Sequence, residues 1–163
     1  MKSGDFKYEK KSARVIRNVS YITLATVSAS GKPWSTPVYA AFDKELHFYW
    51  TSDRESVHSV NIRQNPSAFI TIHRASRYYG RHAVYFEARA EELNKREEIL
   101  MARKFTQARG EKPSGPKEFM GKDFRRVYKA IIEKGWTNDH EKLPDGWRDY
   151  RVELDLRRLR GLL

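Results

Sequence analysis

Residues 46–66, LHFYWTSDRESVHSVNIRQNP, decide the fold of this chain. The first part, 46–51, is rich in aromatic residues, which is typical of a strand on a half-buried pleated surface. Ser52 then precedes Glu55 by three residues, which is the spacing of a capping box and predicts a helix over 52–64. The closing Asn-Pro dipeptide ends that helix. The stretch therefore predicts a strand that leads directly into a helix.

The start of this predicted helix is a candidate site for an anion. A helix N-terminus gathers unpaired N–H groups and the positive end of the helix dipole, which together favour a phosphate. Ser56 and His58 lie in the first turn, where a hydroxyl and an imidazole could hydrogen-bond the same anion. A purely structural alternative stays open, in which Ser52 and Glu55 only cap the helix, His58 is solvated and Trp50 belongs to the core.

Length and composition predict a single folded domain over residues 1–163. The chain is 39% hydrophobic and 33% charged, which argues against a membrane bundle and against wholesale disorder. Its net charge of +11 attracts polyanions, and the absence of Cys excludes disulfides, thiolate zinc sites and a cysteine nucleophile. No stretch approaches the roughly 18 apolar residues of a spanning helix, so we expect a cytoplasmic protein.

The rest of the chain predicts mainly antiparallel strands with flanking helices. Because Pro cannot donate to a strand ladder, Pro37 should lie at an edge or a bulge, leaving Ser35 and Thr36 free to face a ligand. The strand order expected is a meander that closes into a small barrel. Strands are expected at 21–27, 34–42, 46–51, 68–73, 82–93 and 148–156, and further helices at 6–20, 94–110 and 119–134, the last of them ended by Gly135.

Several reaction mechanisms find no support in the sequence. The five His residues show no metal-ligand spacing, and no glycine pattern forms a Walker loop or a dinucleotide fingerprint. No Ser lies in a nucleophile elbow. Redox or other chemistry in this chain should therefore belong to a bound cofactor.

Four segments resemble the pyridoxamine 5'-phosphate oxidase-like family of flavin-binding split β-barrels. They are YITLATVSASGKPWSTP (21–37), FYWTSDRESVHSVNIRQNP (48–66), AVYFEARAEEL (83–93) and WRDYRVELDL (147–156), in the family's order along nearly the whole chain. The resemblance implies an antiparallel split β-barrel of the α+β type, usually a homodimer, with FMN in each of two clefts at the dimer interface. A deazaflavin is the alternative cofactor, and haem is less expected because the His residues offer no clear axial ligand.

The resemblance also implies roles for particular residues, carried over by position. Ser35, Thr36, Pro37 and Val38 would follow the flavin edge; Trp50, Thr51 and Ser52 would meet the ring and the ribityl chain; Ser56, Val57 and His58 would hold the phosphate; His82 would reach the flavin from the other subunit; and Trp136 would cover the ring.

The chain departs from the family's name-giving oxidases at two places. Those enzymes carry an Arg and a Lys on the second strand for the FMN phosphate, where this chain has Ser35 and, approximately, Ala40. They also carry an Arg-x-His arrangement near the C-terminus for the substrate phosphate, which residues 148–151 do not reproduce. Both departures argue against vitamin B6 oxidation.

The expected function is an FMN-dependent oxidoreductase acting on an unknown small molecule. One alternative is a flavin or deazaflavin carrier without turnover. A less favoured alternative is a nucleic-acid binder, suggested by the net charge and by cations and rings that alternate in one loop, namely Arg74, Arg77, Tyr78, Tyr79 and Arg81.

Overall fold

The structure, a computed structural model, describes residues 6–73 and 82–163. The helices and strands in chain order are α1 (Lys7–Asn18), β1 (Tyr21–Val27), β2 (Pro33–Phe42), β3 (Phe48–Asp53), α2 (Val57–Gln64), β4 (Ser67–His73), β5 (Ala83–Glu92), α3 (Arg96–Ala108), the 3-10 helix η1 (Pro116–Phe119), β6 (Arg125–Leu143), β7 (Gly146–Glu153) and α4 (Leu156–Arg160).

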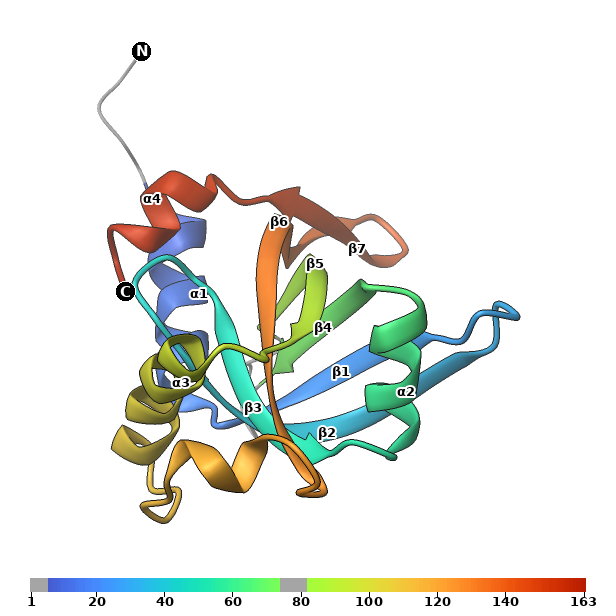
Figure 1. The fold of residues 1–163 in the computed structure, drawn as a ribbon. Helices are drawn as coiled ribbons and strands as arrows, with labels where there is room; N and C mark the ends of the chain where they lie inside the picture. Colours follow the sequence, from blue (N-terminus) through green and yellow to red (C-terminus); the bar gives the residue numbers. More distant parts are fainter. Residues whose placement is uncertain (1–5, 74–81) are drawn as a thin grey trace.

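The strands form one antiparallel sheet that closes on itself (Figure 1). Their order is β3-β2-β1-β4-β5-β6-β7, and β6 also pairs with β3. This extra pairing closes six strands into a barrel, while β7 pairs only with the far half of β6, from Trp136 to Leu143. Helices α1, α3 and α4 lie on one side of the barrel and α2 lies on the other. The predicted split barrel, mainly β with flanking helices, is confirmed.

The predicted meander is wrong at one connection. β4 pairs with β1, not with β3, which precedes it in the chain. Helix α2 carries the chain from β3 to β4 and contacts β1, β2 and β5 on the way. The sequence pattern indicates β3, α2 and β4, but not the strand with which β4 pairs. The alternation of inward and outward residues in β4 would fit beside β3 or beside β1.

The predicted helix over 119–134 is also wrong, because residues 125–143 form the long strand β6. Val127 packs in an outer cluster with Phe119 of η1, whereas the neighbouring Tyr128 points into the barrel core. A strand covered on both faces has apolar residues in succession, and over this length that pattern matches a helical period. Gly135 accordingly lies inside β6 and does not end a helix.

Alternate residues of the strands fill the barrel. Leu24, Ile70 and Phe86 are fully buried and lie side by side on β1, β4 and β5. The Trp50 ring is also fully buried and stacks on Tyr128, with ring centroids 5.6 Å apart and planes 18° apart. The Trp50 side chain is therefore part of the core.

The ends of several elements differ from the prediction. β3 runs on to Asp53, α2 begins at Val57, and the backbone N–H of Glu55 bonds to the Asp53 carboxylate 2.8 Å away. The capping box from Ser52 to Glu55 therefore does not form. The closing strand ends at Glu153 and is followed by α4, a short helix that the sequence did not predict. A hairpin turn at 28–32 joins β1 to β2, with Gly31 at φ +82°.

Pro37 lies at a free strand edge, as predicted. β2 pairs with β1 in continuous register from Pro33 to Tyr39, so the strand is not bulged there. On its other side, β3 pairs with β2 only from Ala40 to Phe42. The first half of β2 thus has one edge without a partner strand among the described residues, and this edge is the split in the barrel.

Gly135 allows Phe86 to lie across β6, and Gly135→Ala tests this contact. A Cβ at this position would lie 2.8 Å from two Phe86 ring atoms and 3.1 Å from Leu156 Cδ2. Because Phe86 is fully buried, we expect overpacking to lower the free energy of unfolding by about 1–3 kcal/mol, measured by urea denaturation. Gly115→Ala is the control, since nothing lies within 4 Å of its Cβ and the change should stay within about 0.5 kcal/mol. Equal midpoints for the two variants would contradict the close contact.

Candidate functional site

Three hydroxyl groups and one imidazole gather where β3 leads into α2. His58 Nε2 lies 2.8 Å from Ser52 Oγ and 3.2 Å from Ser56 Oγ. Ser56 Oγ in turn donates to Ser59 Oγ at 2.8 Å. We call these four residues the serine–histidine cluster. The structure thus brings together Ser56 and His58, which were assigned to the phosphate, and Ser52, which was assigned to the ring and the ribityl chain. It adds Ser59, which the sequence did not single out.

The backbone beside this cluster also offers hydrogen-bond donors. Ser56 is the N-cap of α2, but its hydroxyl makes no capping hydrogen bond to the helix backbone. The first i to i−4 bond of the helix is from Val60 N to Ser56 O, so the preceding N–H groups have no partner within the helix. Val57 is 46% exposed at this end. Hydroxyls and free N–H groups at a helix start fit a phosphate.

Two arginines supply positive charge near the cluster. Arg63 Nη1 donates to the Arg54 carbonyl at 2.6 Å, which places the end of α2 beside the loop before it. Arg54 Nε pairs with Glu55 at 2.9 Å, and Arg63 pairs with Glu92 at 3.4 Å. Both guanidinium groups are thus paired with carboxylates, and neither residue was predicted as part of a phosphate site.

Burial of His58 favours the neutral form of its imidazole in the folded protein. Its side chain is buried, and this burial lowers the pKa of the imidazole below its ordinary value. A neutral imidazole can donate one hydrogen bond and accept another, so His58 orients the hydroxyls of Ser52 and Ser56 without adding a charge.

The lowered pKa of His58 predicts a stability that depends on pH. The unfolded chain binds this proton with the ordinary pKa of about 6.5, whereas the folded chain resists it, so acidification below about pH 6.5 favours unfolding. We expect the free energy of unfolding, from urea titrations, to fall as the pH is lowered through this range. His58→Gln should flatten this dependence, leaving the part due to His82, whose pKa burial and Lys11 also lower. An unchanged slope in His58→Gln would contradict the assignment.

The four β2 residues assigned to the flavin edge divide between the two faces of the sheet. Val38 is buried, while Ser35 and Pro37 are exposed, as strand alternation requires. Thr36 opposes the core residue Leu24. All four lie on the half of β2 with the free edge, so their backbone groups as well as the side chains of Ser35 and Pro37 are accessible to a ligand.

Trp136 lies far from the serine–histidine cluster within one copy of the chain. Ser52 pairs with Arg126 on β6, and Trp136 follows ten residues later on the same strand. At about 3.3 Å per residue, Arg126 and Trp136 are roughly 33 Å apart along the strand. His82 precedes β5 at the same distant end, where Val84 opposes Thr137. One copy therefore brings neither Trp136 nor His82 to the cluster.

Trp136 shares the outer face of the sheet with the β2 edge. One row of directly paired residues crosses five strands, namely Pro37, Thr23, Thr71, Tyr85 and Trp136. The neighbouring row on the same face, two residues further along each strand, is Ser35, Ala25, Phe69, Glu87 and Lys134. We call these two rows the outer face. Most of its side chains are apolar or uncharged, and Phe69 is 37% exposed, so the face presents a surface suited to another protein surface.

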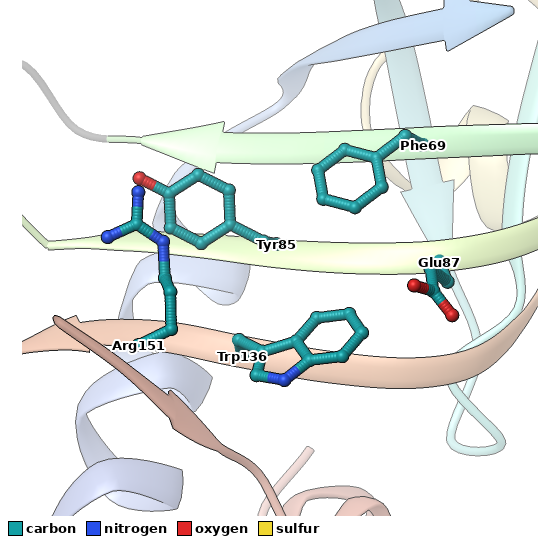
Figure 2. A pocket seen from close by; sticks show the side chains of 5 residues that line it. All are labelled: Phe69, Tyr85, Glu87, Trp136 and Arg151. Carbon is teal, nitrogen blue, oxygen red and sulfur yellow. The ribbon is translucent and has the colours of Figure 1, made fainter.

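A pocket of about 430 Å³ opens on this face (Figure 2). Phe69, Tyr85 and Trp136 form its walls, and Arg151 and Glu87 lie at its rim. Of these five residues the sequence reasoning named only Trp136. The alternation of β4 and β5 could have indicated that Phe69 and Tyr85 face outward, but Trp136 and Arg151 meet there only because β6 is a strand.

Thr51 is held by a buried network from α3. Its hydroxyl donates to Glu111 at 3.2 Å, and Glu111 pairs with Arg103, which is only 3% exposed. Arg103 also donates to the carbonyl of Lys112 and the hydroxyl of Ser114, at 2.8 and 2.9 Å. This network fixes the end of β3 against the loop after α3.

The remaining expectations concern metals, membranes and nucleic acid. Across residues 6–73 and 82–163, no group of His, Asp or Glu could hold a metal ion. None of the helices in that part of the chain is both long enough and apolar enough to cross a membrane. The basic and aromatic loop that suggested nucleic-acid binding, 74–81, lies outside the described residues.

The comparisons with known proteins agree with this fold. The structure is similar to a putative 5-nitroimidazole antibiotic resistance protein from Bacteroides thetaiotaomicron, with a TM-score of 0.63 and 13% identity over 83% of this chain and 82% of that one. It is also similar to a heme binding protein from Mycobacterium smegmatis, with a TM-score of 0.64 and 18% identity over 94% of this chain but 60% of that one. An F420 reductase matches with a TM-score of 0.55 and 16% identity over 75% of this chain and 93% of that one.

These likenesses show a shared fold. No curated protein matches the sequence. The family described as "Pyridoxamine 5'-phosphate oxidase" matches residues 8–131, which are most of the chain and include the serine–histidine cluster and the free edge of β2. The chain therefore belongs to the pyridoxamine 5'-phosphate oxidase-like family.

Proposed function

We propose that this protein binds FMN between two copies of the chain and uses it as an oxidoreductase on a small molecule. The observation that carries the proposal is the serine–histidine cluster at the start of α2, beside the free edge of β2. It combines hydroxyls, unpaired backbone N–H groups and nearby arginines, which is the chemistry that holds a phosphate.

The residues present fit the parts of FMN in order. Ser52, Ser56 and His58 would hold the phosphate with the N–H groups of α2. Because the Thr51 hydroxyl donates to Glu111, Thr51 would offer the ribityl chain its backbone groups, at the end of β3 that β2 does not cover. The edge of β2, from Ser35 to Val38, would offer backbone and side-chain hydrogen bonds to the rim of the ring. Bound flavin supplies hydride transfer at the ring, and the chain positions it and leaves one side open.

A second copy is required to complete the site. Trp136 and His82 lie at the far end of the barrel from the cluster, roughly 33 Å away along β6. If the outer faces of two copies pack together in a twofold arrangement, the Trp136 end of one copy meets the α2 end of the other. The outer face carries three aromatic rings, those of Phe69, Tyr85 and Trp136, and its only charged residues are Glu87 and Lys134, which suits such a contact.

FMN titration of the purified, flavin-free protein tests the cofactor and its phosphate site. We expect binding seen as a shifted visible absorption band, and an affinity reduced about 10- to 100-fold in Ser56→Ala, because a hydrogen bond to a charged phosphate contributes about 1.5–3 kcal/mol. Ser30→Ala, in the exposed β1–β2 turn, is the matched control and should bind as the parent does. Riboflavin, which lacks the phosphate, should be insensitive to Ser56→Ala; equal losses for both flavins would contradict a phosphate role.

The same titration distinguishes FMN from the other cofactors that this fold carries. Deazaflavin F420 and haemin have different visible spectra, so each can be offered alone and in competition with FMN. The proposal predicts that FMN binds most tightly of the three. A protein that takes up haemin or F420 but not FMN would overturn the choice of cofactor.

Turnover separates an enzyme from a flavin carrier. An enzyme should pass through many cycles when a nicotinamide nucleotide or a flavin reductase is supplied with an acceptor such as a quinone or a nitroaromatic compound. The measurement is acceptor consumed per FMN-loaded chain. If each FMN-loaded chain reduces only one molecule of every acceptor tried, the protein is a flavin carrier and not an enzyme.

A further inference from the structure

The pocket on the outer face carries one arginine, Arg151. The Arg151 guanidinium lies 4.3 Å from the centre of the Tyr85 ring. Among residues 6–73 and 82–163, no carboxylate lies within ion-pair distance of it, whereas Arg148 on the same strand pairs with Glu141 and Arg158 pairs with Asp155. Arg151 therefore keeps its hydrogen-bond donors available at the mouth of the pocket.

The walls of the pocket suit a flat ring. Phe69 and Tyr85 lie 6.5 Å apart between ring centres, and Trp136 lies directly opposite Tyr85 on the neighbouring strand. Figure 2 shows the three rings around one space, with the Arg151 side chain over the Tyr85 end. A volume of about 430 Å³ is within the range of pockets that hold small organic ligands.

The two charged residues give the pocket a positive end at Arg151 and a negative end at Glu87. In the strand register, Arg151 lies opposite Asn138, which is two residues beyond Trp136 on β6. Glu87 lies opposite Lys134, which is two residues before Trp136. Four residues of strand separate the two rows, or about 13 Å. An anionic group would therefore turn toward Arg151 and away from Glu87, whose own charge is partly offset by Lys134 at 3.9 Å.

We infer that this pocket binds a planar aromatic compound with a carboxylate, the ring between Phe69, Tyr85 and Trp136 and the carboxylate on Arg151. The guanidinium can meet a carboxylate with two parallel hydrogen bonds, and leaving its place over Tyr85 costs little because the ligand ring replaces that contact. The compound's role as the substrate rests on the proposed function, since Trp136 is the residue assigned to the flavin ring. In the proposed dimer this pocket would form part of the cleft between the two outer faces, and binding of the compound itself does not depend on flavin.

Calorimetric titration with a matched pair of probes tests the inference. 2-Naphthoate and 2-naphthamide have the same rings, but only the first is charged. On flavin-free protein we expect 2-naphthoate to bind about tenfold more tightly or better, and Arg151→Gln to remove that preference. Arg148→Gln, three residues away and outside the pocket, is the control and should keep it. Equal affinities for the two probes, or a preference that survives in Arg151→Gln, would overturn the inference.

A second titration separates a substrate pocket from part of the flavin site. In the presence of saturating FMN, 2-naphthoate should still bind with a similar affinity. Competition between FMN and 2-naphthoate would show that the pocket belongs to the flavin and would overturn the substrate role. If the protein takes up no FMN at all, the proposed function fails, while the flavin-free titration still decides whether Arg151 recognises the carboxylate.

Discussion

Replacing Arg103 with Met is expected to lower the free energy of unfolding by about 3–5 kcal/mol. The guanidinium is buried, pairs with Glu111 and donates to Thr106 Oγ1 at 2.8 Å as well as to the loop after α3. Met fills a similar volume, but it leaves the Glu111 carboxylate half-enclosed without its cation. Urea denaturation followed by circular dichroism measures the loss.

Lys104→Met is the control for this prediction. It removes a cation from the exposed face of the same helix, so it should change the free energy of unfolding by no more than about 0.5 kcal/mol. A similar loss in both variants would mean that the loss does not come from the Arg103 network, and a small loss in both would mean that this network does not hold the loop. Because Glu111 accepts from Thr51, Arg103→Met should also weaken FMN binding where it still folds.

Replacing Ala25 with Glu is expected to separate the proposed dimer and to weaken FMN binding at least about 100-fold. Ala25 lies in the middle of the outer face, between Ser35 and Phe69. In a monomer the new carboxylate faces water, but in a dimer it is buried without a partner, which costs several kcal/mol. Sedimentation velocity measures the state of assembly, and FMN titration measures the affinity.

Ala29→Glu makes the same chemical change in the exposed turn between β1 and β2. It should leave both assembly and FMN affinity unchanged. If Ala25→Glu forms the same dimer as the parent, the outer face is not the interface. If Ala25→Glu is monomeric but binds FMN normally, one copy suffices for the site.

The strands that alternate cleanly could be predicted from sequence. β1, β4 and β5 each have one face on the core and one face outward, so buried and more exposed residues alternate along most of each strand. The turn at Gly31 joins β1 to β2. The free edge at Pro37 followed from proline's missing N–H.

β6 could not be predicted from its local pattern. Val127 and Tyr128 are both fully buried because β6 has protein on both of its faces, so the period of two is lost there. The pairing of β4 with β1 is likewise a tertiary choice that no short-range signal encodes.

The candidate site was predictable only in part. The residues of the serine–histidine cluster lie within eight positions of one another, so local spacing suggested the anion site even though the helix begins at Val57. The pocket draws Phe69, Tyr85, Trp136 and Arg151 from four different strands. Such a group becomes visible only once the register of β4 to β7 is known.

Sedimentation velocity of the FMN-loaded protein, recorded in both the protein and the flavin absorption bands, tests the central claim most directly. The account predicts one boundary at the mass of two chains, with the flavin moving in that boundary at one FMN per chain, and loss of both dimer and bound flavin in Ala25→Glu. Flavin that moves with a single chain at the same affinity would contradict it.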